Sequence, residues 1–142
     1  HNLSALAGAE MVVAEFGAWP SFHDAEVLSF DSERSSLVAT SSAVARMKVH
    51  VRRYEPSNEG TAEYHLALVK SVVIAFRFTG IEALEVSEFN HQNVIDSIAV
   101  SEASTPSGAH ISVEVESIFG FGGQWRCRTA EVVSVVCGPS EA

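Results

Sequence analysis

Hydrophobic and polar residues alternate along most of the chain, a pattern typical of half-buried β-strands. The clearest case is residues 43–53, where the odd positions as far as Val51 are apolar and most even positions are basic. The same period of two recurs in residues 71–79 and 110–117. Further strands are predicted over residues 26–32, 62–68, 81–88, 94–101 and 124–136. Clean alternation favours antiparallel pairing, because parallel strands buried on both faces show continuous apolar runs.

One segment near the N-terminus has a different pattern. Residues 3–16 are mostly good helix formers, with Asn2 placed to cap the start and Gly17 placed to end the helix. Trp19 and Pro20 cannot continue it, because Pro20 lacks an amide hydrogen and favours an extended residue before it. Turn-rich clusters separate the predicted strands. They lie at residues 32–36, 56–60, Gly80, 104–108 and 120–123.

These elements predict an α+β fold. We expect one N-terminal helix packed on a mostly antiparallel sheet of about seven or eight strands. The chain has 142 residues and shows no internal repeat or break in composition, so residues 1–142 are expected to form a single domain. At 46% hydrophobic and 19% charged residues, the chain is not intrinsically disordered.

Charge and hydrophobicity narrow the possible partners. The formal charge at pH 7 is −9, which argues against general nucleic-acid binding, since that binding depends on Lys and Arg. The longest apolar runs, residues 72–76 and 132–137, are far shorter than the roughly 20 residues that cross a bilayer. We therefore expect neither nucleic acid nor a membrane as a partner, and basic partners are more plausible.

The basic strand face and the two cysteines have structural interpretations. We expect the basic face to pair with carboxylates of a neighbouring strand; its members are Arg46, Lys48, His50 and Arg52. The candidate partners are Glu63, Glu114 and Glu116. The alternative is a site for phosphate or for an acidic partner. Cys127 and Cys137 lack metal or redox spacing and are expected to be buried free thiols.

The densest polar and aromatic cluster is W-P-S-F-H-D-A-E, residues 19–26, between the helix and the first strand. His23 titrates near neutral pH and stands next to Asp24, an arrangement suited to acid-base chemistry or metal ligation. Adjacent residues on an extended chain point to opposite sides, however, so the two do not automatically form a dyad. In the structural interpretation, which we favour, Asp24 accepts backbone hydrogen bonds, His23 anchors the turn, and Trp19 and Phe22 pack in the core.

The second cluster is F-N-H-Q-N-V-I, residues 89–95. Asn90, His91, Gln92 and Asn93 supply many donors and acceptors, which suit either ligand recognition or the satisfaction of buried backbone groups. His91 would join His23 at a metal site only if the two loops meet, and no regular histidine spacing supports such a site. The segment I-F-G-F-G-G-Q-W, residues 118–125, lacks the Lys of a phosphate-binding loop and is predicted to be a hairpin turn packed by aromatics.

Three blocks of the sequence resemble one family. The blocks are, in chain order, F-G-A-W-P-S-F-H-D-A-E-V (residues 16–27), F-N-H-Q-N-V-I, and F-G-F-G-G-Q-W-R-C with A-E-V-V-S-V after it. They are similar to the bacterial immunity protein 50 family of polymorphic toxin systems. The Ala-rich opening and the basic strand depart from that pattern. The positions that match the family motifs are Trp19, Pro20, Phe22, His23, Asp24, Glu26, Asn90, Gln92 and Asn93.

The resemblance implies a cytoplasmic protein, a monomer or homodimer, that is not an enzyme. It would bind a cognate toxin and use no catalytic residue, metal or cofactor. The negative charge fits a basic toxin. The expected partner-binding residues are glutamates on strand faces or edges: Glu82, Glu85, Glu88, Glu114 and Glu116. The alternatives are a metal-dependent hydrolase using His23, Asp24, Glu26 and His91, and a small-ligand or dimeric structural module.

Overall fold

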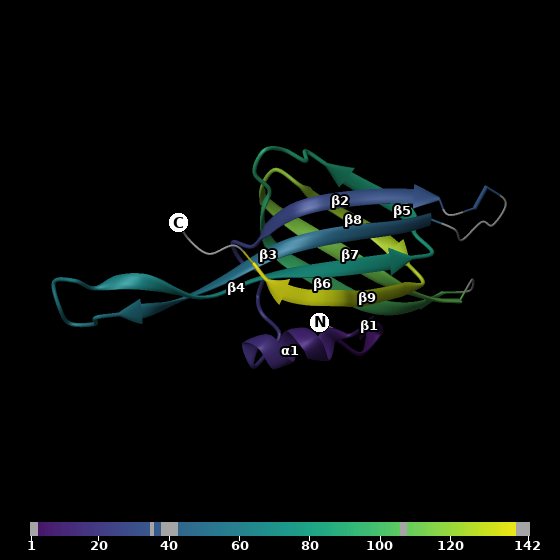
Figure 1. The fold of residues 1–142 in the computed structure, drawn as a ribbon. Helices are drawn as coiled ribbons and strands as arrows, with labels where there is room; N and C mark the ends of the chain where they lie inside the picture. The colour runs from purple at the N-terminus through teal and green to yellow at the C-terminus, as the bar shows by residue number, and fades with distance from the viewer. Residues whose placement is uncertain (1–2, 35, 38–42, 106–107, 139–142) are drawn as a thin grey trace.

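The computed structural model describes residues 3–34, 36–37, 43–105 and 108–138. In these residues one α-helix and a nine-stranded sheet form the predicted α+β fold (Figure 1). The elements in chain order are η1 (Leu3–Ala5), β1 (Leu6–Ala7), α1 (Ala9–Phe16), β2 (Glu26–Arg34), β3 (Ala43–Ser57), β4 (His65–Thr79), β5 (Glu82–Ser87), β6 (Val94–Thr105), β7 (Gly108–Phe119), β8 (Gly122–Cys127) and β9 (Thr129–Cys137). The strand order is β1-β9-β4-β3-β2-β6-β7-β8-β5. The described pairings are antiparallel except β1 with β9.

The sheet curls so that its two halves face each other across one core. Within the described residues, β2 and β6 share a single registered pair, Glu26 with Val94, so the two halves are joined narrowly. The Trp125 ring on β8 packs against Phe78 of β4 and Phe30 of β2, with centroid distances of 5.1 and 5.4 Å. The alternating apolar positions therefore point inward from both halves, as the period of two predicted.

The helix is shorter than predicted. Residues 3–7 form η1 and β1, because Leu6 pairs with Ala130 of β9 and the sheet satisfies the backbone groups that a helix would have used. Gly8 then begins α1 with φ 79°, where an added Cβ would lie 2.5 Å from the Val132 carbonyl oxygen. The predicted end is confirmed, since the amide of Gly17 donates to the Val13 carbonyl at 2.7 Å. The predicted cap, Asn2, lies outside the described residues.

Three strand boundaries differ from the prediction. The strands expected over 62–68 and 71–79 are one continuous strand, β4, and β3 continues past residue 53 to Ser57. The strand expected over 124–136 divides at Arg128, whose amide donates to the Thr79 carbonyl at 2.8 Å. This bond turns the chain from β8 into β9, which pairs with β4 in the other half of the sheet.

The basic face of β3 pairs with a neighbouring strand, but not with the glutamates that we expected. Arg46 Nη1 lies 3.5 Å from Asp31 and 3.4 Å from Glu33, both on β2. His50 differs from the other members of this face because it is buried, with Nε2 2.7 Å from the Ser71 hydroxyl. Burial lowers the pKa of His50, and the nearby Arg52 charge lowers it further.

The cysteines are both free, and only one fits the expectation of burial. Cys127 is buried, whereas Cys137 is exposed at the end of β9. Burial raises the pKa of the Cys127 thiol to about 12. The apolar stretch around Cys137 was misleading because β9 crosses from the core to the surface before it ends, leaving Val136 exposed as well.

Candidate functional site

The first family block forms a tight loop that enters β2. Phe22 and Asp24 both have positive φ, 64° and 65°, and the Ala25 amide donates to the Phe22 carbonyl at 3.0 Å. These left-handed residues turn the Phe22 ring into the core, where it is 2% exposed and meets the Trp19 ring edge-on at 5.3 Å. The predicted core packing of Phe22 is confirmed, and Trp19 is half-buried against the core with Pro20 beside it.

His23 lies at the surface of this loop between two carboxylates. Its Nδ1 is 2.8 Å from Asp96 Oδ1, and its Nε2 is 3.6 Å from Asp24 Oδ2. The hydrogen bond to Asp96 raises the pKa of His23, and the negative charge of Asp24 raises it further. Sequence reasoning missed Asp96, which is 73 positions away and becomes a neighbour only through β6.

His23 and His91, which would form a metal site only if their loops met, contact different residues. The His91 ring packs against Phe119, with centroids 5.9 Å apart, while His23 bonds to Asp96. Over the described ranges, no three His, Cys, Asp or Glu side chains lie close enough together to hold a metal ion.

Asn93 joins all three family blocks. Its buried Oδ1 accepts from the amides of Asn90 at 2.8 Å and Phe121 at 3.0 Å, and its Nδ2 donates to the carbonyls of Asn90 and Val27. Gly120 completes the contact, since an added Cβ would lie 2.4 Å from the Gln92 carbonyl oxygen. The amide group of Asn93 thus fixes the turn before β8 against the start of β2 and β6.

The first two family blocks also bond to each other through their backbones. Asp24 donates to the Ile95 carbonyl at 3.0 Å, and Ile95 donates to the Ala25 carbonyl at 2.9 Å. Glu26 pairs in register with Val94 and with His50, at the seam between the two half-sheets. The side chains of Asn90 and Gln92 are exposed, so these two polar residues remain available at the surface.

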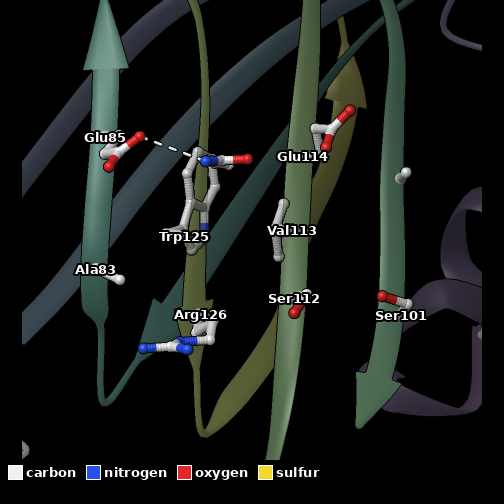
Figure 2. A pocket seen from close by; sticks show the side chains of 10 residues that line it. Ala83, Glu85, Ser101, Ser112, Val113, Glu114, Trp125 and Arg126 are labelled. Atoms are coloured by element: carbon white, nitrogen blue, oxygen red, sulfur yellow. Dashed lines mark hydrogen bonds between the residues drawn. The ribbon is translucent and has the colours of Figure 1, made fainter.

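A second cluster lies on the outer face of β5, β8 and β7. Glu85, Gln124 and Glu114 form one registered row across these strands, and Gln124 Nε2 donates to Glu85 Oε2 at 3.3 Å (Figure 2). Glu116 follows Glu114 by two positions on β7, so it shares the same face. Residues of this row line a hollow of about 440 Å³. Arg126 and Ser112 form the next registered row on this face, as Figure 2 shows.

The five predicted partner-binding glutamates are therefore divided in space. Glu85, Glu114 and Glu116 line one continuous outer surface, which we call the acidic face. Glu82 begins β5 in register with Arg126 of β8, and Glu88 follows the end of β5. Sequence reasoning missed Gln124 and Arg126 as neighbours of the acidic face, although both alternate with the buried Trp125.

Comparison with known proteins identifies one family. Neither a search of curated proteins nor a search of solved structures gave a match. No helix in the described ranges is long and apolar enough to cross a membrane. The model of one family, described as immunity protein 50, matches residues 8–138, a range that contains every described strand except β1. The chain therefore belongs to the immunity protein 50 family.

Proposed function

We propose that the protein is a non-enzymatic inhibitor that binds a cognate bacterial toxin in the cytoplasm and neutralises it. The observation that carries this proposal is the match to an immunity protein family over residues 8–138. A neutralising protein needs a stable surface for its partner, and a nine-stranded, mostly antiparallel sheet is suited to carry one.

The charge of the protein supports a basic toxin as the partner. The chain carries −9 at pH 7, and the acidic face combines Glu85 of β5 with Glu114 and Glu116 of β7, on either side of β8. Such a surface speeds association with a basic protein by electrostatic steering, an effect that weakens as salt screens the charges. Glu82 and Glu88 extend the negative potential to both ends of β5.

The test uses the protein encoded immediately upstream as the candidate toxin. Its binding is measured by calorimetry, and its toxicity is measured in cells with and without this chain. We expect submicromolar affinity and loss of toxicity, with affinity falling between about 0.05 and 0.3 M salt. Absence of both binding and protection would refute the proposal.

Charge reversal tests the acidic face separately. The triple variant Glu85→Lys, Glu114→Lys, Glu116→Lys should slow association at least tenfold and flatten its salt dependence. Glu10→Lys on α1 is the control for a surface charge on another element. If the triple variant binds and responds to salt as the wild type does, the acidic face is not the contact.

A further inference from the structure

The strands β3 and β4 continue beyond the rest of the sheet as a projecting two-stranded ribbon. Over the described residues, β3 pairs with β2 only as far as His50, and β4 pairs with β9 only from Val72. The β3–β4 register nevertheless continues to the pair of Ser57 with His65. Residues 52–71, which we call the arm, therefore extend away from the sheet, as Figure 1 shows in blue and teal.

The root of the arm is fixed to the helix. Arg53 and Lys70 are a registered pair, and their cations lie 5.9 and 5.8 Å from the centroid of the Phe16 ring at the end of α1. Arg53 donates to the Phe16 carbonyl at 3.1 Å, and Lys70 donates to the Glu15 carbonyl. These contacts satisfy the last carbonyls of α1 and hold the direction of the arm relative to the sheet.

One face of the arm is apolar and exposed. Residues directly opposite each other in a β-ladder share a face, so the pairs Tyr54 with Leu68 and Pro56 with Leu66 form one stripe. Leu66 is 59% exposed, and Tyr64 in the turn at the tip is 53% exposed. A two-stranded ribbon in water is marginally stable on its own, so covering this stripe would stabilise it.

The charge of the arm indicates what covers it. Beyond its cationic root, residues 54–69 contain Glu55, Glu59 and Glu63 and no Lys or Arg. A second copy of this chain carries −9 and would bring like charge to the tip, whereas a basic surface would complement it. A narrow projecting ribbon also reaches into a concave site, which a flat sheet face cannot do.

We propose that the arm inserts into a basic, partly apolar cleft of the toxin and is the principal binding element of this protein. The proposal rests on the proposed function and goes further by naming the contact. Tyr64 and Leu66 are the apolar anchors, and the three glutamates set the orientation. The loop of the first family block adjoins the arm, because Trp19, Phe22 and His23 line a small hollow together with Val51 and Arg53 at its root.

The experiment compares affinity for the upstream-encoded protein between matched variants of the full chain. We expect Tyr64→Ser with Leu66→Ser to weaken binding about 100-fold, as loss of aromatic and apolar anchors does. Val133→Ser, at a similarly exposed apolar position on β9, is the control and should leave affinity unchanged. Glu55→Lys, Glu59→Lys and Glu63→Lys together should slow association at least tenfold.

Each outcome decides a separate point. Wild-type binding that the arm variants leave intact would overturn the arm proposal while the proposed function stands. If the wild-type chain does not bind the upstream-encoded protein, both the arm proposal and the proposed function are refuted. Light scattering tests the second-copy alternative: a wild-type dimer that Leu66→Ser converts to monomer would overturn the toxin as occupant. Thermal unfolding shows whether each variant folds, and protection of arm amides from hydrogen exchange on binding gives an independent measure of the contact.

Discussion

Arg53 and Lys70 lie opposite each other in the β3–β4 ladder, and both place a cation over the ring of Phe16. The pair connects the arm formed by β3 and β4 to the C-terminal end of the short α1 helix. Lys70 also lies 3.3 Å from the Glu15 carboxylate, so one side chain contacts a ring, a carbonyl and a carboxylate.

Replacing Lys70 should loosen this attachment. We expect Lys70→Met to lower the free energy of unfolding by about 1 kcal/mol, because it removes a cation–π contact and a charge-assisted bond to a helix C-terminus. Lys48→Met on the exposed side of β3 is the control and should stay within about 0.5 kcal/mol of wild type. Urea denaturation measures both, and equal values for the two variants would contradict the assigned role of Lys70.

Asn93 should be the most sensitive polar position in the described structure. Asn93→Ala leaves the buried amide of Phe121 without its acceptor and removes three further bonds, so we expect a loss of about 2–4 kcal/mol. Gln92→Ala, at the exposed neighbouring position, should cost little. Chemical denaturation of both variants checks this expectation, and a stable Asn93→Ala protein would show that the three blocks do not depend on its side chain.

The position of His23 predicts a pH dependence with a defined sign. Asp96 and Asp24 raise its pKa above the ordinary 6.5, so the folded protein binds the proton more tightly than the unfolded chain. The resulting stabilisation is complete below pH 6.5 and is lost as pH rises through the folded pKa. An NMR titration of wild type and Asp96→Asn should show a lower His23 pKa in the variant; an unchanged pKa would show that the hydrogen bond is absent in solution.

The two thiols should differ sharply in reactivity. Thiolates react with iodoacetamide, and burial holds the Cys127 pKa at about 12 while Cys137 is exposed. In the folded protein, we expect Cys137 to be alkylated first and Cys127 only after denaturant unfolds the chain. Mass spectrometry of wild type and Cys137→Ser checks the order. Rapid labelling of native Cys137→Ser would contradict the buried position of Cys127.

The alternation of residues was sufficient to predict the sheet but not its boundaries. The inward positions Met47 and Val49 are buried because the period of two fixes which face a residue occupies. The true start of the helix depends on the pairing of Leu6 with Ala130, and no local pattern reports a partner so far along the chain. The division between β8 and β9 likewise depends on the Arg128–Thr79 bond.

The family motifs identified the right segments without showing how their residues act. The sequence indicated that Phe22 packs inward, but it left open whether the polar run 90–93 recognises a ligand or satisfies backbone groups, and it did not single out Asn93. It did not reveal Asp96 as the partner of His23, since that contact needs β6 to be placed beside the loop. The expected glutamates were separated by sheet geometry into the acidic face and the two ends of β5.

The parallel pairing of β1 with β9 also affects how the chain assembles during translation. Leu6 leaves the ribosome long before Ala130, yet the two are neighbours in the finished sheet. Until residues 129–137 have been made, the segment Val72–Thr79 of β4 is paired only with β3 and presents an open edge on its other side. The pairing of β1 with β9 can therefore form only after the last of the described strands has been made, although β1 is the first of them along the chain.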